Sequence, residues 1–147
     1  MRVTFIYLDL AVDDPAYSGY FYHGIAYLSA VLKKAGHQTS LIQLTKEIPA
    51  VEFQERIKTL RPDLVGFSST SHMFSRVKKY AAAAKKAVNV PIICGGIHPT
   101  ICPEEVLEDK NIDMVCRGEG EMALLDLCQK MEKSESIENI ESIWVKK

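Results

Sequence analysis

The fold is decided by residues 63–96, DLVGFSSTSHMFSRVKKYAAAAKKAVNVPIICGG, which contain two apolar runs on either side of a helical pattern. The two runs, residues 63–68 and 91–94, are short and almost continuously apolar, as in strands that are covered on both faces. Residues 74–88 lie between them. Their inward-facing positions, at helical spacing, are Val77, Ala81, Ala84 and Val88. A strand, a helix and a strand in this order predict a right-handed crossover between parallel strands.

The same alternation continues on both sides of this unit. Further strands are predicted at residues 3–8, 39–44 and 114–116. Further helices are predicted at residues 24–35, 51–60, 103–107 and 122–133. Alternating strands and helices indicate the α/β class with a mostly parallel sheet. We therefore predict a Rossmann-like or flavodoxin-like, doubly wound five-stranded parallel sheet with the strand order 2-1-3-4-5.

Length and charge limit what the chain can be. Its 147 residues correspond to about one domain. With 18 basic and 19 acidic residues the formal net charge is −1, so nothing indicates a nucleic-acid partner. No apolar run approaches the roughly 18 residues of a membrane span, and no signal peptide is recognisable at the N-terminus, so we expect no membrane association.

The end of the chain differs in character from the rest. We expect residues 1–133 to form the domain and residues 134–147 to be a linker or the start of a following domain. The reason is that a polar stretch there ends in the strand-like run Ile143-Trp144-Val145, as if a longer protein had been cut in mid-strand. The alternative is a small extra strand that pairs locally.

The cysteines suggest a reducing compartment. None of the four, Cys94, Cys102, Cys116 and Cys128, forms a Cys-x-x-Cys pair. Cys94 and Cys116 lie in apolar strand-like runs and Cys128 lies on the apolar side of a helix, which favours buried structural thiols over a zinc or redox motif. Reduced thiols are typical of the cytoplasm, where we expect this protein.

The loops after the strands are the candidate binding site, because ligands of open α/β sheets bind beyond the carboxyl ends of the strands. The first loop, residues 9–23, is long and contains the aromatic run Tyr20-Phe21-Tyr22. These side chains either form a flat apolar surface for a large planar ligand or cover the core. His23, before Gly24, is either a metal ligand or a surface residue near the start of a helix.

Two further loops carry polar groups and glycines. Ser68, Ser69 and Thr70 follow the third strand, where their hydroxyls can bind a polar group, cap the next helix, or do both. Gly95 and Gly96 follow the fourth strand, before His98 and Pro99. Two successive glycines remove side chains where another group must approach the backbone closely.

The fifth strand is followed by Arg117-Gly118-Glu119-Gly120-Glu121-Met122-Ala123, formally the dinucleotide pattern G-x-G-x-x-A. Two observations argue against that function. No strand–helix–strand unit continues beyond it, and Glu119 and Glu121 would repel a pyrophosphate. Acidic residues instead favour the first turn of a helix. The phosphoacceptor aspartate of a receiver domain, the phosphate loop of a flavodoxin, the P-loop and the hydrolase elbow are also missing from their places.

Taken together, these motifs resemble the cobalamin (vitamin B12)-binding domain at the N-terminus of many radical S-adenosylmethionine enzymes. That group includes proteins similar to the anaerobic magnesium-protoporphyrin IX monomethyl ester cyclases. The resemblance covers nearly the whole chain. It rests on residues 24–37 (GIAYLSAVLKKAGH), 62–68 (PDLVGFS), 95–100 (GGIHPT) and 117–121 (RGEGE).

The resemblance implies a cobalamin cofactor and roles for particular residues. The nucleotide tail of cobalamin would pass between strands 1 and 3 and meet the backbone at Gly95 and Gly96. Ser68 and Ser69 would hydrogen-bond the buried tail, and the corrin ring would lie over the strand ends. The residues expected to bind the cofactor are Tyr20, Phe21, Tyr22, His23, Gly24, Ser68, Ser69, Thr70, Gly95, Gly96, His98, Gly118 and Glu119.

The chain departs from the family in two respects. Many cobalamin domains carry Asp-x-His-x-x-Gly in the first loop, with the histidine on cobalt. Aligning Gly24 with the motif's glycine places Gly19 and Phe21 at the other two positions, with His23 two residues away. We therefore expect base-off binding without a histidine ligand, and an aromatic residue of this loop below the metal.

The second departure concerns catalysis. The Cys-x-x-x-Cys-x-x-Cys motif of a radical domain is absent from the sequence. A 4Fe-4S cluster and S-adenosylmethionine would therefore be bound by a downstream domain of the same full-length chain, and this chain alone would be non-catalytic. The parent would be a radical enzyme of the methyltransferase or cyclase type. The alternative is a domain that has lost cobalamin and serves as a scaffold or substrate-recognition module.

Overall fold

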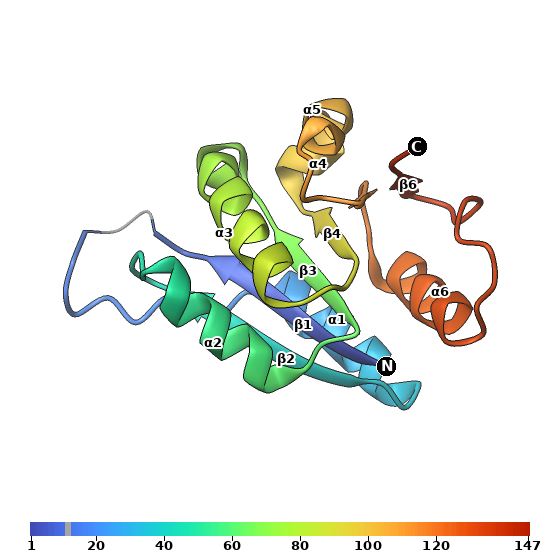
Figure 1. The fold of residues 1–147 in the computed structure, drawn as a ribbon, viewed down its shortest axis with the longest axis horizontal. Helices are drawn as coiled ribbons and strands as arrows, with labels where there is room; N and C mark the ends of the chain where they lie inside the picture. Colours follow the sequence, from blue (N-terminus) through green and yellow to red (C-terminus); the bar gives the residue numbers. More distant parts are fainter. Residues whose placement is uncertain (11–12) are drawn as a thin grey trace.

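The computed structural model describes residues 1–10 and 13–147, which form one mixed sheet covered by helices on both faces (Figure 1). The strands are β1 (Arg2–Leu8), β2 (Gln38–Leu44), β3 (Leu64–Ser68), β4 (Ile92–Gly95), β5 (Met114–Cys116) and β6 (Ile143–Val145). The helices are α1 (His23–Lys34), α2 (Ala50–Leu60), the 3-10 turn η1 (Ser71–Met73), α3 (Phe74–Ala87), α4 (Ile97–Ile101), α5 (Pro103–Glu108) and α6 (Glu121–Glu132).

The strand order is β2-β1-β3-β4-β5-β6, and the first five strands are parallel. This confirms the α/β class and a mostly parallel sheet. The predicted count of five strands is wrong, because β6 adds a sixth strand antiparallel to β5. Ile140 and Ile143 are buried at the edge of β5, so apolar burial explains why this segment pairs locally. That residues 134–147 also lead into another domain stays a prediction.

The helices form a layer on each face of the sheet. On one face, α2, α3 and α5 bury side chains against the strands, and Figure 1 shows α2 and α3 lying in front of the sheet. On the other face, α1 and α6 pack beside each other and against the strands. None of the helices in residues 1–10 and 13–147 combines the length and the apolar character needed to cross a membrane.

The register of the central strands decides which side chains reach each face, because successive residues of a strand point to opposite sides. The row that faces α2 and α3 consists of Ile6, Phe67 and Cys94. Toward α1 and α6, the two rows nearest the C-terminal ends of the strands consist of Phe5, Gly66 and Ile93, and of Tyr7, Ser68 and Gly95. A glycine therefore interrupts each of these two rows.

One helix was not expected from the sequence. Helix α4 begins at Ile97, immediately after the glycine pair, where no helix was predicted from the sequence. Pro99 is its third residue, a position at which a missing backbone N–H costs little. The chain therefore turns directly into a helix after β4, and α4 forms part of the wall of the site described next.

Candidate functional site

A cavity of about 370 Å³ lies at the C-terminal ends of β3, β4 and β5, between the sheet and helices α1 and α6. Its floor is formed by Phe5 and Ile93 on neighbouring strands. Its far wall is formed by Ile25 and Leu28 of α1 and by Leu124 of α6. The lining is mostly apolar, with a few hydroxyls and carboxylates near the mouth, a character that is typical of small-molecule sites.

Two glycines leave room for this cavity. Gly66 lies between Phe5 and Ile93, and a side-chain Cβ there would be 3.2 Å from the ring of Phe5. Gly95 lies one level closer to the mouth. A Cβ on Gly95 would meet only Cys116, at 3.7 Å, which is ordinary van der Waals contact. The protein itself would therefore accept a side chain at Gly95, and the missing side chain leaves space that a ligand can occupy.

Gly96 has a different role. Its φ of 103° lies in the left-handed region, and a Cβ would be 2.8 Å from the Ser69 carbonyl oxygen and 2.9 Å from the Ser69 nitrogen. The Ser69 N–H donates to the Gly95 carbonyl oxygen at 2.9 Å, and the Ser69 carbonyl accepts from the His98 N–H at 3.1 Å. Gly96 is thus required for the β3 and β4 loops to join, whether or not a ligand is present.

The hydroxyl run after β3 is divided between two sides of the sheet. Ser68 lines the cavity, and its hydroxyl donates to the Tyr22 hydroxyl at 3.1 Å. Tyr22 is stacked on Tyr7 with ring centroids 4.5 Å apart. Ser69 is buried outside the cavity, with its hydroxyl on the Thr70 carbonyl, and no side-chain capping bond forms at the start of η1 or α3. Of the three hydroxyl residues after β3, Ser68 is therefore the one placed to contact a ligand in the cavity.

The glycine-rich loops after β4 and β5 are joined by a single hydroxyl. Thr100 donates to the Gly96 carbonyl oxygen at 2.8 Å and accepts from the Gly118 N–H at 2.9 Å. Glu119 follows at the mouth of the cavity, and Glu121 begins α6. The loop therefore leads into the first turn of a helix, as the argument against a dinucleotide pattern expected.

The first loop is anchored at one buried carboxylate. Asp9, at the end of β1, accepts from the Tyr17 hydroxyl at 2.7 Å and from the Tyr20 N–H at 2.9 Å. Burial and this hydrogen bond raise the pKa of Tyr17, so its hydroxyl keeps the proton that it donates. Tyr20 and Phe21 are 69% and 73% exposed. His23, the first residue of α1, is exposed, and its ring lies edge-on to that of Phe21.

His98 lies away from the cavity. It is buried on the α3 side of the glycine pair, where its ring packs against Phe74 with centroids 4.3 Å apart. Its Nδ1 is 3.1 Å from the Ser71 hydroxyl. The first residues of α4 turn the chain after Gly96, so that His98 faces α3 while Ile97 and Thr100 face the cavity.

The chemistry of the cavity suits binding better than catalysis. Cys116 lines it, and burial together with the Glu121 carboxylate raises the pKa of this thiol to about 11, so the thiol is neutral near pH 7. Ser68 is bonded to a tyrosine hydroxyl, which is no general base at neutral pH. The described side chains in the cavity wall thus offer shape, apolar surface and a few hydrogen-bonding groups.

The sequence-predicted residues divide into two groups. Those that line the cavity are Tyr22, Gly24, Ser68, Gly95, Gly96, Gly118 and Glu119. Those that lie outside its lining are Tyr20, Phe21, His23, Ser69, Thr70 and His98. Gly66, Thr100 and Asp9 were not predicted from the sequence as site residues. A signal existed for Gly66, because a glycine inside an apolar strand indicates close approach of another group.

This combination of fold and cavity matches a known family. The family model of the B12 binding domain matches residues 16–128, and the chain belongs to this family. The match includes residues 16–23 of the first loop, the hydroxyl run, the glycine pair and most of α6. The chain thus resembles the cobalamin-binding domains of cobalamin-dependent radical S-adenosylmethionine enzymes.

Its relatives are longer proteins. The anaerobic magnesium-protoporphyrin IX monomethyl ester cyclase of Rubrivivax gelatinosus is 30% identical over 132 residues, which cover 86% of this chain and 24% of that protein. An uncharacterized methyltransferase of Pyrococcus horikoshii is 30% identical over 120 residues, covering 80% of this chain and 26% of that protein. The chain therefore spans about a quarter of the length of these relatives.

Solved structures show the same fold. The radical S-adenosylmethionine methyltransferase TsrM from Kitasatospora setae, solved with tryptophan and a S-adenosylmethionine analogue, has a TM-score of 0.81 at 17% identity, over 97% of this chain and 28% of that one. The cobalamin-dependent radical enzyme OxsB, solved with aqua-cobalamin and S-adenosylmethionine, has a TM-score of 0.76 at 20% identity, over 97% and 20%. At these identities the likeness establishes the fold alone.

Proposed function

We propose that this chain is the cobalamin-holding module of a larger radical S-adenosylmethionine enzyme of the methyltransferase or cyclase type. The cofactor binds base-off, with its nucleotide tail in the cavity and without a histidine on cobalt. The observation that carries this proposal is the cavity itself, which opens at the carboxyl ends of β3, β4 and β5 and is kept clear by Gly66 and Gly95.

The residues present fit such a tail. A cavity of about 370 Å³ lies near the lower end of the range for small-ligand sites, so it suits a flat aromatic base better than the whole cofactor. Its apolar walls remove the base from water, and Ser68 and Thr100 supply hydroxyls near the mouth. Tyr22 is fixed by its stack on Tyr7 and narrows the entrance on the α1 side.

The surroundings of the mouth suit a planar ring. Ile97 and Ile101 on α4 are each more than 60% exposed and both belong to the cavity lining, so exposed apolar surface continues from the cavity outward. Apolar residues gathered in this way mark binding surfaces more often than isolated ones do.

The position of His23 supports a histidine-free lower face. His23 lies outside the cavity lining and contacts Phe21, with ring centroids 5.0 Å apart. When bound, cobalamin would supply a cobalt centre for methyl transfer or redox chemistry. The residues of this chain would bind the cofactor, orient it and exclude water from its tail.

The catalytic part of the enzyme would lie in another domain of the same full-length chain. The relatives are about four times as long as this chain. One TsrM structure contains both cobalamin and a 4Fe-4S cluster. The cluster and S-adenosylmethionine would belong to that further domain. Whether the parent enzyme is a methyltransferase or a cyclase would depend on the substrate that this further domain binds.

Retention of hydroxocobalamin tests the proposal. The purified chain is mixed with hydroxocobalamin, desalted and examined by visible absorbance, with bovine albumin as a non-binding control. We expect stoichiometric retention with a base-off spectrum that is unchanged in His23→Ala. A base-on spectrum, or one that changes in His23→Ala, would refute the stated binding mode. A colourless protein, both as this chain and as the full-length parent, would indicate instead a scaffold that has lost the cofactor.

A further inference from the structure

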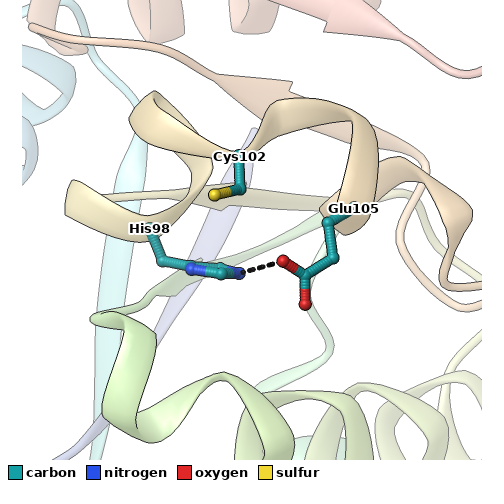
Figure 2. Close-up of side chains that lie close together, drawn as sticks. All are labelled: His98, Cys102 and Glu105. Atoms are coloured by element: carbon teal, nitrogen blue, oxygen red, sulfur yellow. Dashed lines mark ion pairs between the residues drawn. The ribbon is translucent and has the colours of Figure 1, made fainter.

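A second cluster of chemically active side chains lies outside the cavity, in the segment from α4 to α5. His98 belongs to α4, Cys102 joins the two helices, and Glu105 belongs to the first turn of α5. One ligand atom from each residue lies within 4.8 Å of the other two. Figure 2 shows the His98 ring and the Glu105 carboxylate facing each other, joined by a dashed line, with the Cys102 sulfur above them.

His98 presents an unused ring nitrogen to this cluster. The residue is 5% exposed, and in the described part of the chain its Nε2 has no hydrogen-bond partner. An unpaired buried polar atom is destabilising, so a native protein rarely keeps one without a reason. The nearest acceptor is a Glu105 carboxylate oxygen at 3.7 Å, which is beyond hydrogen-bonding distance.

The rest of the histidine ring is held in a fixed orientation. Its Nδ1 is 3.1 Å from the Ser71 hydroxyl, and its face packs against Phe74. A histidine that binds a metal through one nitrogen commonly donates a hydrogen bond through the other, which sets its tautomer. With Nδ1–H donating to Ser71, the lone pair of Nε2 points into the cluster.

We propose that His98, Cys102 and Glu105 form a binding site for a divalent metal ion of the zinc type, separate from the cobalamin cavity. Bonds of about 2.0–2.3 Å to a tetrahedral ion place two ligand atoms roughly 3.3–3.8 Å apart. A nitrogen and an oxygen ligand need about 3.3–3.5 Å, so the His98–Glu105 separation of 3.7 Å has to shorten only slightly. The Glu105 side chain is 55% exposed and Cys102 is half-buried, so small rotations of both bring all three groups to one ion.

The donor set selects the kind of metal. Imidazole nitrogen and thiolate sulfur favour zinc and similar transition metals, whereas calcium and magnesium prefer oxygen alone. Three protein ligands leave a fourth position, on the exposed side near Glu105, for water. The bound ion would tie α4 to α5 and thereby brace Gly96, whose carbonyl begins α4 and whose loop contacts Ser69.

The test uses the purified, metal-stripped chain under reducing conditions and without an affinity tag. Zinc is titrated against a chromogenic chelator, and we expect one ion per chain. Cys102→Ser and Glu105→Gln should each weaken binding by at least about tenfold, since loss of even an outer-shell partner typically costs 10- to 100-fold. The matched control is Glu104→Gln, which removes a neighbouring exposed carboxylate outside the cluster and should leave binding unchanged.

A second readout identifies the thiolate. Cobalt(II) added to the cobalamin-free chain should give a thiolate-to-cobalt charge-transfer band in the near ultraviolet, which Cys102→Ser abolishes. Far-ultraviolet circular dichroism should show that both variants remain folded, because neither removes a fully buried group. Absence of one-to-one binding would overturn the proposal, as would binding that neither ligand substitution weakens. Gly95→Val should retain the metal, which separates this site from the cofactor cavity.

Discussion

The two faces of β1, β3 and β4 are built from alternating residues of the same strands, yet one is filled and the other is hollow. Toward α2 and α3, the central row is Ile6, Phe67 and Cys94, all buried. Toward α1 and α6, Gly66 and Gly95 interrupt the corresponding rows. A shift of the register by one residue would exchange the two faces, because successive side chains of a strand point to opposite sides. Which face has room for a ligand therefore depends on which face Gly66 and Gly95 point to.

Removal of a side chain from the filled face should have the largest effect on the free energy of unfolding. We expect Phe67→Ala to lower the free energy of unfolding by about 3–5 kcal/mol, because Phe67 is 3% exposed and the neighbouring side chains cannot close the gap. Urea denaturation followed by circular dichroism measures this. A loss below about 1 kcal/mol would show that the two faces are equally tolerant of empty space.

Addition of a side chain to the hollow face should act on binding instead of stability. Gly95→Val places two methyl groups in the cavity, and we expect cobalamin retention to fall by about 100-fold or more, or about 2.7 kcal/mol. The free energy of unfolding should change by less than about 1 kcal/mol, because a Cβ there makes only ordinary contact with Cys116. Equilibrium dialysis measures the affinity.

The control for this substitution is Ala50→Val, which adds two methyl groups, one carbon atom fewer than Gly95→Val, at an exposed position at the start of α2. It should leave binding unchanged. Unaltered binding by Gly95→Val would move the site away from the cavity. Gly96 is a poor place for the same experiment, since its left-handed φ and its contact with Ser69 make any side chain there destabilising for reasons unrelated to a ligand.

Ser68 and Ser69 test whether only the side chains that point to the hollow face contact the cofactor. Ser68 lines the hollow face, whereas Ser69 points out of it and bonds the Thr70 carbonyl. We expect Ser68→Ala to weaken cobalamin binding by about tenfold, the worth of one hydrogen bond, and Ser69→Ala to leave it unchanged. Equal losses, or a larger loss for Ser69→Ala, would show that the hydroxyl run does not act through the cavity.

The sequence was enough to predict the parallel strands and several residues that line the candidate cavity, because hydrophobic periodicity marks the strands and paired glycines mark a close approach to the backbone. Apolar runs separated by amphipathic helices led to the order of the first five strands. The glycine pair at 95–96 indicated close approach after β4. The functions of these two glycines could not be separated, because only the fold shows that Gly96 faces Ser69 and Gly95 faces the cavity.

What the sequence did not predict depends on short elements and on pairing in three dimensions. β6 is three residues long, and its apolar pattern cannot say which strand edge it joins. α4 has five residues, too few for helical periodicity to be visible, yet it turns His98 toward α3. His98 comes close to Glu105 because of that turn. Its closeness to the glycine pair in the sequence therefore suggested, wrongly, that it lines the cavity.

Two buried thiols provide the finest test of the comparison. Cys94 belongs to the filled face and Cys116 to the hollow one, and burial raises the pKa of both, that of Cys116 to about 11. The thiolate is the reactive form, so labelling of Cys116 by a small alkylating reagent should accelerate about tenfold per pH unit between pH 8 and 10. Cys94 should stay unlabelled under the same conditions, because its side chain is fully buried on the filled face and burial raises the pKa of its thiol. Peptide mass spectrometry follows each thiol separately, and bound cobalamin should slow the reaction of Cys116 alone. Labelling of both thiols at similar rates would mean that global opening of the sheet, and not the cavity, admits the reagent.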